Sequence, residues 1–340
     1  MEPMPNYKHI VETTLVPHTA FAEASQRLEQ CFAYADGASE PICIAIVGES
    51  RTGKSRALEE TFARHPIVRH PEGLTVPILR VKTPSKPTVK GLAELMLRGM
   101  NDPKFDSGTE NSKTLRLRTL MQNAGTIMVM IDEFQHFYDK GSHKVMHHVA
   151  DWLKILVDDS KVALVVAGLP TCRAVLDQNE QLAGRFLSPV FMPRFDWRDD
   201  DQREEFIGIL AAFQESIGAV FDLPRLDGPE MAFRCYCGTG GLIGYLTKFL
   251  RQAIWNALDA DTKTIGLTGL LRAHDQAVWS KDGPVSLSSP FGKGFSTTPT
   301  DDLIARIKRI GTPADELPTP VQRRRRAPGV PSVQAVLSAS

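Results

Sequence analysis

Residues 48–55 read "GESRTGKS" and combine residue types that together bind phosphate. They match the pattern G-x-x-x-x-G-K-[ST], which lies between an apolar strand and a helix. Here the run "CIAIV" comes before the turn and "RALEETFA" comes after it. Gly48 and Gly53 allow backbone angles that direct successive N–H groups at one anion, and the following helix adds its positive end. We therefore predict a phosphate-binding loop rather than an ordinary glycine turn.

The side chains of this loop predict a nucleoside triphosphate with Mg²⁺. In such loops the lysine, here Lys54, reaches the β- and γ-phosphates, and the hydroxyl of Ser55 is offered to the metal. The residues expected to bind the nucleotide are Gly48, Glu49, Ser50, Arg51, Thr52, Gly53, Lys54, Ser55 and Arg56. The expected cofactors are ATP and Mg²⁺.

A pair of carboxylates ends the apolar run "TIMVMIDEF". Because the carboxyl ends of parallel strands share one edge of a sheet, we expect Asp132 and Glu133 beside the phosphate-binding loop. We predict that Asp132 joins Ser55 in holding the metal, through water, and that Glu133 orients or deprotonates the attacking water. A carboxylate at the second position favours hydrolysis over phosphoryl transfer to a metabolite. The chain is thus predicted to be an ATPase.

Two further positions are candidates for the catalytic site. Thr171 is the first polar side chain after the run "KVALVVAG". It is expected either to contact the γ-phosphate or the attacking water, or to serve as a turn hydroxyl. Arg185, in "NEQLAGRF", comes just before an expected edge strand. It is expected to reach the γ-phosphate of an adjoining copy of the chain, with a surface ion pair as the alternative.

The apolar runs predict the scaffold that positions these residues. The runs "ICIAIVG", "VPILRVKT", "TIMVMIDE" and "KVALVVAGL" are rich in β-branched residues and are separated by helical patterns. This alternation predicts an α/β fold with a parallel sheet flanked by helices. The run "SPVFMPRF" contains two prolines and is predicted to be an edge strand. After "DWRDDDQREEF", whose carboxylates suit a helix start, the pattern is helical and predicts a small all-helical lid domain.

Composition along the chain predicts four regions. Residues 1–40 form an N-terminal extension with a helix at about 20–34, and residues 41–197 form the nucleotide-binding domain. Residues 198–280 form the helical lid domain. Residues 281–340 are rich in Pro, Ser, Thr and Gly and carry the basic run "RRRR", so we expect a flexible basic tail.

The overall composition limits where the protein acts and what attracts it. The 340 residues include 40 basic and 40 acidic side chains, so any binding to nucleic acid must come from local patches. An odd number of cysteines, five, favours reduced thiols. No signal-peptide core or bilayer-length apolar run is found, so we expect a cytoplasmic protein without a membrane partner. His143 and His147 share helical spacing but lack the H-E-x-x-H pattern, so a metal is not expected there.

With these residues placed, the chain resembles an AAA+ ATPase, and more narrowly the TniB/TnsC family of transposition regulators. The resemblance spans about residues 17–279. It rests on "GESRTGKS", on "IDEFQHF", on "AGLP" after the fourth strand, on "NEQLAGRF", and on "GGLIGYLTKFLRQA" in the lid. The first motif is specific to nucleotide-binding proteins in general, and the combination of the others points to this family.

The resemblance implies a DNA-binding regulator of transposition. Such a protein assembles on double-stranded DNA as a homo-oligomer, a ring or helical filament, and hydrolysis disassembles it. Its implied partners are a TniQ-like target selector and a DDE transposase of the TniA/TnsB type. One position departs from the pattern. Many AAA+ lids carry a nucleotide-contacting arginine where this chain has Gly244, and Lys248 is either its substitute or a solvent-facing lysine.

A protein that encircles DNA should bind its phosphates with little sequence preference and strong salt dependence. The candidate DNA contacts lie between the second and third expected strands and are Lys104, Lys113, Thr114, Arg116 and Arg118. The alternative is a solvated helix face. In the tail, the arginine run and the segment "SPFGKGF" are further candidates for contact with DNA or the transposase.

Three rival functions share the phosphate-binding loop. One is another AAA+ loader or signalling ATPase, and the second is a P-loop kinase acting on small molecules. The third is a scaffold that binds ATP without hydrolysing it. DNA-dependent hydrolysis and ATP-dependent polymers would separate the transposition regulator from the first, and phosphorylated product in a metabolite screen would favour the second. Hydrolysis that Glu133→Gln abolishes would exclude the third.

Overall fold

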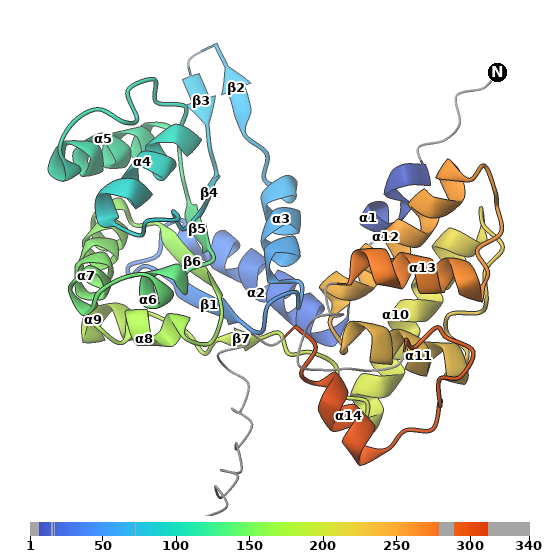
Figure 1. Cartoon of the computed structure of the whole chain (residues 1–340). Coiled ribbons are helices and arrows are strands. Elements are labelled where there is room, and N and C mark those ends of the chain that lie inside the picture. The colour runs from blue at the N-terminus through green and yellow to red at the C-terminus, as the bar shows by residue number, and fades with distance from the viewer. Residues whose placement is uncertain (1–6, 15, 17, 72, 279–288, 312–340) are drawn as a thin grey trace, which may run out of the picture.

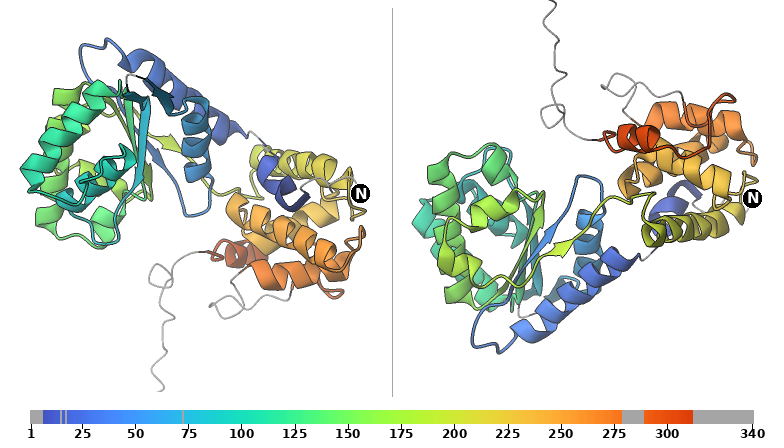
Figure 2. Two further views of the ribbon diagram at one scale, coloured as in Figure 1. Left: turned by 90° about the horizontal axis from the view of Figure 1, so that it is seen from above. Right: turned by 90° about the horizontal axis from the view of Figure 1, so that it is seen from below.

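The structure is a computed structural model that describes residues 7–14, 16, 18–71, 73–278 and 289–311. Figure 1 shows two lobes, one built on a β-sheet and the other made of helices, which we call the lid. Figure 2 shows that residues 19–35 extend along the sheet lobe toward the lid. Among the described residues, no helix has the length and apolar character that crossing a bilayer requires.

The sheet of the first lobe is parallel, as predicted. Its strands are β1 (Cys43–Val47), β4 (Ile78–Lys82), β5 (Met128–Asp132), β6 (Ala163–Gly168) and β7 (Val190–Phe191), in the order β4-β5-β6-β1-β7. Every residue of β1, β5 and β6 is buried, which explains why these strands are continuous apolar runs. The prediction that β7 is an edge strand is confirmed.

Helices cover both faces of the sheet, so alternate residues of each strand enter different cores. Ile44 and Ile46 pack with the side of α2 (Thr19–Ala35) and α3 (Lys54–Arg64). Cys43, Ala45 and Val47 face the opposite core. The helices on that side are α4 (Val89–Gly99), α5 (Glu110–Asn123), α6 (His136–Asp139), α7 (His143–Ser160), α8 (Cys172–Leu176) and α9 (Glu180–Ala183).

A small antiparallel hairpin was not foreseen. It consists of β2 (Val68–His70) and β3 (Gly73–Thr75), lies between α3 and β4, and projects beyond the main sheet in Figure 1. All three residues of β2 are exposed. The sequence "VRHPEGLT" is too polar and too short for its strands to stand out as apolar runs.

The lid has its own apolar core. It contains α10 (Asp200–Gly218), α11 (Pro229–Thr239), α12 (Ile243–Asp259) and α13 (Leu267–Ala277). The acidic run caps α10 as expected, because the Asp199 side chain accepts a hydrogen bond from the Gln202 N–H. The N-terminal turn η1 (Tyr7–His9) and α1 (Ile10–Thr13) also pack on this lobe, against α12 and α10. The predicted N-terminal extension, residues 1–40, is therefore shared between the two lobes: η1 and α1 pack on the lid, and α2 packs on the sheet lobe.

The predicted start of the flexible tail lies too early in the chain. Residues 289–311 pack onto the lid, where Phe291 is 1% exposed and stacks on Phe249 with ring centroids 4.7 Å apart. The helix α14 (Asp301–Ile307) buries Ile304 and Ile307. These few buried apolar side chains were missed in the sequence because the segment around them is rich in Pro, Ser, Thr and Gly. "SPFGKGF" is thus part of the lid, whereas the arginine run at 323–326 lies outside the described residues.

Asp196 ties the C-terminal segment to the connection between the lobes. Its carboxylate accepts hydrogen bonds from Lys308, at 2.5 Å, and from Arg198. Partial burial raises the pKa of Asp196, but the hydrogen bonds from Arg198 and Lys308 outweigh this effect and lower it from 3.8 to about 2. A carboxyl with a depressed pKa stabilises the fold above its ordinary pKa, and this contribution is lost as the pH falls toward the folded value.

Asp196→Asn should therefore lower the melting temperature at pH 7, because the hydrogen bonds from Arg198 and Lys308 no longer reach an ionised acceptor. The difference from the unsubstituted protein should shrink as the pH falls from about 4 toward 2. Thermal unfolding followed by circular dichroism between pH 7 and pH 2 measures this difference. Asp106→Asn, at an exposed carboxylate of the sheet lobe, is the control. A difference that stays constant over this range would show that the ionised pair contributes nothing.

Candidate functional site

The loop between β1 and α3 has the backbone geometry of an anion cradle. Gly53 has φ +101° and Arg51 has φ +67°, both in the left-handed region. The carbonyl of Gly53 accepts hydrogen bonds from the Arg56 and Ala57 N–H groups, and α3 begins at Lys54. The positive end of α3 therefore faces the loop. The side chain of Thr52 secures the turn by donating to the Glu49 carbonyl at 2.9 Å.

Lys54 lies buried between this loop and the end of β5. Its ammonium donates to the carbonyls of Gly48, at 2.9 Å, and Glu49. Burial lowers the pKa of Lys54, and the nearby carboxylates of Glu133 and Asp132 oppose that shift. A phosphate entering the loop would supply the negative charge that this buried ammonium needs, and it would compete with the two carbonyls for its protons.

Asp132 has one carboxylate oxygen engaged and one available. Oδ1 accepts a hydrogen bond from the Glu133 N–H at 2.9 Å. Oδ2 is buried without a hydrogen-bond partner, although the Arg80 guanidinium lies 3.8 Å away. A buried anionic oxygen of this kind is the donor that Mg²⁺ takes from protein in phosphate sites, and the half-buried Ser55 lies in the first turn of α3. These residues fit the predicted metal.

Glu133 is held by a residue that the sequence analysis did not single out. Gln135 is 5% exposed, and its Nε2 donates to Glu133 Oε2 at 2.6 Å. Its Oε1 accepts from the Leu169 N–H, in the loop after β6. A Cβ on Gly168 would lie 2.2 Å from that oxygen, so a larger residue there would displace the Gln135 amide. The motif "IDEFQHF" contains Gln135, but its second contact lies 34 positions away and leaves no local signal.

Two adjoining hollows flank the loop. The first, about 270 Å³, is lined by Ser50, Lys54, Ser55, Glu133 and Gln135, among others. The second, about 230 Å³, has a more apolar lining that includes Val16, Phe21, Ile209, Phe213, Ile243 and Thr247. Gly53, Arg56 and Gly244 line both. A polar end beside an apolar end suits a molecule with phosphates at one end and a flat ring at the other.

His18 contributes to the second hollow as a neutral ring. Burial lowers its pKa, and the negative charge of Glu205 only partly opposes the shift. Its Nδ1 accepts a hydrogen bond from the Phe21 N–H at the start of α2. The hollow therefore presents a neutral imidazole rather than a cation at neutral pH.

Thr171 and Arg185 lie in different surroundings. The Thr171 hydroxyl follows β6 and is buried without a hydrogen-bond partner. Arg185 pairs with Asp158 at 2.7 Å and donates to the Gln181 carbonyl, which is the ion pair named as its alternative. Its own carbonyl accepts from the Cys43 N–H, at the beginning of β1 and away from the phosphate-binding loop. Its role toward a second copy stays a prediction that requires the pair with Asp158 to open.

The predicted DNA contacts do not form one free basic surface. Lys113 is fully buried and pairs with Glu94 at 3.0 Å, so its prediction as a phosphate contact is wrong for this conformation. Thr114 accepts a hydrogen bond from Trp152, while Arg116 pairs with Asp102 and Arg118 with Asp159. Lys104 is exposed. The helical spacing of "SKTLRLRT" did not reveal that these side chains fasten α5 to its neighbours.

Gly244 and Lys248 of the lid differ in how they are placed. The Gly244 N–H donates to the Arg51 carbonyl at 2.8 Å, so the lid contacts the phosphate-binding loop through its backbone. Lys248 is exposed on α12. Within the described residues, no group of three His, Cys, Asp or Glu side chains is placed to hold a metal.

Comparisons with known proteins identify the family and the fold of the chain. Residues 6–197 match the family described as "TniB: Bacterial TniB protein". No curated protein matches the chain. Among solved structures, the Aeropyrum pernix ORC2 protein in ADPNP–ADP complexes superposes with a TM-score of 0.58 at 12% identity, over 82% of this chain and 72% of that one.

Two further structures show the same likeness. Cdc6p from Pyrobaculum aerophilum gives a TM-score of 0.56 at 12% identity, over 83% of this chain and 74% of that one. The Aeropyrum pernix ORC1 protein in complex with DNA gives 0.55 at 14% identity, over 79% and 69%. At these identities the likeness establishes the fold, a parallel sheet flanked by helices and followed by a helical region.

Proposed function

Because the chain belongs to the bacterial TniB family, we propose that it is an AAA+ ATPase that regulates DNA transposition. One observation carries the ATPase assignment. Lys54 and Glu133 line the polar hollow beside the loop, and the charge of the buried Asp132, whose Oδ2 has no hydrogen-bond partner, acts on Lys54. We assign residues 41–197 as the nucleotide-binding domain and the helical lobe as its lid.

Each group of residues in the site has a different role in the proposed hydrolysis. The backbone N–H groups of the loop and the Lys54 ammonium bind the phosphates, and the apolar hollow receives the adenine ring. Ser55 and Asp132 would hold Mg²⁺, which supplies charge neutralisation at the phosphate oxygens when bound. Glu133 accepts a proton from the attacking water, and Gln135 fixes the direction of that carboxylate.

The finer proposal concerns DNA and protein partners. We propose that ATP-bound copies assemble on double-stranded DNA, link a TniQ-like target selector to a DDE transposase, and separate after hydrolysis. The family membership supports this proposal, and a solved structure with the same fold, the Aeropyrum pernix ORC1 protein, is in complex with DNA. Lys104 is the candidate DNA contact that is most accessible.

The test combines an ATPase assay with electron microscopy. Phosphate release is measured with and without duplex DNA at several salt concentrations, and the same samples are imaged for polymers. We expect DNA to stimulate hydrolysis, polymers to require ATP, and both effects to weaken steeply as salt rises. If the rate of hydrolysis is the same with and without DNA and no polymers form, the transposition proposal is refuted. The remaining candidate would then be a loader or signalling ATPase.

The base pocket gives a separate prediction. Thr247 lines the apolar hollow, so Thr247→Trp should fill it and weaken ATP binding about tenfold or more. Inorganic tripolyphosphate, which has no ring, should bind with unchanged affinity. Isothermal titration calorimetry measures both ligands. Lys248→Trp, at the exposed neighbouring position on α12, is the matched control. Equal losses for ATP and tripolyphosphate would contradict the base pocket.

A further inference from the structure

The connection between the two lobes is wedged between the phosphate-binding loop and a glycine turn of the lid. A Cβ on Gly48 would lie 2.1 Å from the Met192 carbonyl oxygen, and a Cβ on Gly241 would lie 2.3 Å from that of Phe195. The Phe195 N–H also donates to the Gly241 carbonyl at 3.0 Å. Backbone therefore touches backbone on both sides of residues 192–195, with no space for either side to shift alone.

The lid also contacts the loop directly. The Gly244 N–H donates to the Arg51 carbonyl, and a Cβ on Gly244 would lie 2.8 Å from the Arg51 Cβ. The Arg51 guanidinium lies over the Tyr245 ring, 4.5 Å from its centroid. Glycine at 244 therefore brings the first turn of α12 against the loop, where an arginine side chain would keep it away.

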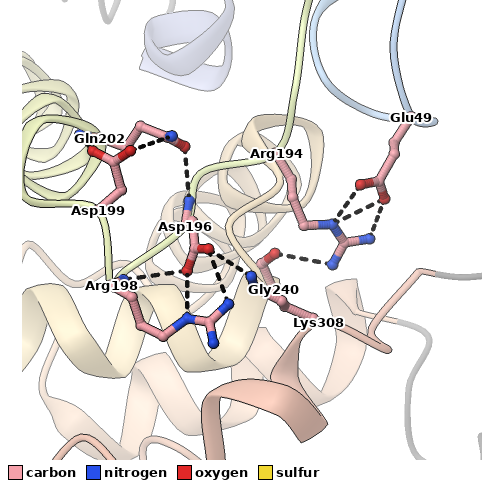
Figure 3. Close-up of polar contacts among 8 residues, drawn as sticks. All are labelled: Glu49, Arg194, Asp196, Arg198, Asp199, Gln202, Gly240 and Lys308. Carbon is pink, nitrogen blue, oxygen red and sulfur yellow. Dashed lines mark hydrogen bonds and ion pairs between the residues drawn. The ribbon is translucent and has the colours of Figure 1, made fainter. Parts of the chain in front are cut away.

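Arg194 joins all three parts through its side chain (Figure 3). Its Nε donates to the Glu49 carboxylate at 3.0 and 2.9 Å, and its Nη2 donates to the same carboxylate. Its Nη1 donates to the Gly240 carbonyl at 3.2 Å, at the C-terminal end of α11. The Arg194 side chain is 8% exposed and its bond to Gly240 is buried, whereas the Glu49 side chain is 49% exposed, so the charge-assisted pair is shielded on the arginine side only.

Glu49 links Arg194 to the site where the phosphates of a nucleotide would bind. Its backbone carbonyl holds the Lys54 ammonium, while its side chain holds Arg194. A triphosphate in the loop draws the ammonium away, so the Glu49 carbonyl keeps the Thr52 hydroxyl as its donor but loses the ammonium, and the peptide can shift. Because the Glu49 carboxylate is fixed to Arg194, that movement reaches Gly240.

We propose that Arg194 is the positioning residue through which the lid responds to the nucleotide, in a chain whose lid has Gly244 in place of a nucleotide-contacting arginine. This inference rests on the proposed function, since it requires that ATP bind the loop. Arg194 itself touches no reacting atom. It converts occupancy of the phosphate-binding loop into a change in the turn at residues 240–245.

Hydrogen exchange measured by mass spectrometry on the full chain separates binding from coupling. The probe is AMP-PNP with Mg²⁺ at saturating concentration. Peptides covering residues 48–58 report occupancy of the loop, and peptides covering residues 236–250 report the response of the lid. In the unsubstituted protein we expect AMP-PNP to slow exchange in both regions, because both become more constrained.

Arg194→Met should preserve the protection of residues 48–58 and reduce that of residues 236–250 by about fivefold or more, the lower end of typical coupling between sites. Glu49→Gln, which removes the charge but leaves the Arg194 contact with Gly240, should give a smaller loss and provides a second test if Arg194→Met folds poorly. Arg225→Met is the matched control, because Arg225 also makes a two-point pair, with Asp227, on the exposed surface of the lid.

Each outcome decides a different question. Loss of lid protection in Arg194→Met alone supports the inference. An unchanged lid response, an equal loss in Arg225→Met, or loss of loop protection in Arg194→Met at saturating AMP-PNP overturns it. If the unsubstituted protein shows no protection at residues 48–58, the proposed nucleotide binding itself fails, and the inference fails with it.

Discussion

Glu133→Gln is expected to slow ATP hydrolysis by about 10²–10⁴-fold while ATP still binds. Glutamine has nearly the same shape and its amide oxygen still accepts the hydrogen bond from Gln135, so the left-handed backbone at this position, φ +56°, should persist. Only the capacity to take a proton from water is removed. Phosphate release at saturating ATP measures the rate, and a fluorescent ATP analogue measures the affinity.

The same variant tests the proposed cycle of assembly. If hydrolysis disassembles the polymer on DNA, Glu133→Gln should accumulate polymers with ATP that the unsubstituted protein forms only briefly. Glu29→Gln is the control, because Glu29 lies on α2 and pairs with Arg64 and His65 away from the site. Hydrolysis at the normal rate in Glu133→Gln would refute the assignment of the base.

The parts of this protein that could be predicted are those with short-range causes. A glycine-rich turn between a strand and a helix fixes its own backbone, so "GESRTGKS" identified the phosphate-binding loop from eight adjacent residues. Asp132 and Glu133 followed by the same reasoning, because a buried parallel strand that ends in carboxylates places them at the loop edge of the sheet. Short apolar runs that alternate with helical patterns indicate buried parallel strands, and all five predicted strands are present.

The parts that could not be predicted depend on partners far away in the chain. Arg194 and Glu49 are 145 positions apart, and nothing near either residue marks them as a pair. Lys113 is predicted from the sequence as a DNA contact, with a solvated helix face as the alternative, yet its ammonium donates to the Phe105 carbonyl and pairs with Glu94. In the C-terminal segment a few large apolar residues decide the packing while the surrounding residues resemble a linker. Local pattern shows what a residue can do, and tertiary contact decides what it does.

Gly48→Ala is expected to destabilise the fold by about 1–3 kcal/mol and to weaken ATP binding. The new Cβ would lie 2.1 Å from the Met192 carbonyl oxygen, a backbone atom that cannot rotate away. Met192 also donates its N–H to the Val47 carbonyl at 2.8 Å, so relief of the clash requires β7 to separate from β1. Urea unfolding followed by circular dichroism measures the stability, and calorimetric titration measures ATP affinity.

Gly208→Ala is the matched control for this prediction, because a Cβ on this exposed glycine of α10 would meet nothing within 4 Å. It should stabilise the protein by about 0.5–1 kcal/mol, since alanine is the better helix former. Opposite signs for the two substitutions would show that the first glycine of the phosphate-binding loop is required by the connection to the lid as well as by the phosphates. An unchanged unfolding midpoint in Gly48→Ala would mean that residues 192–195 yield readily, and the close coupling of loop and lid would then lose its structural basis.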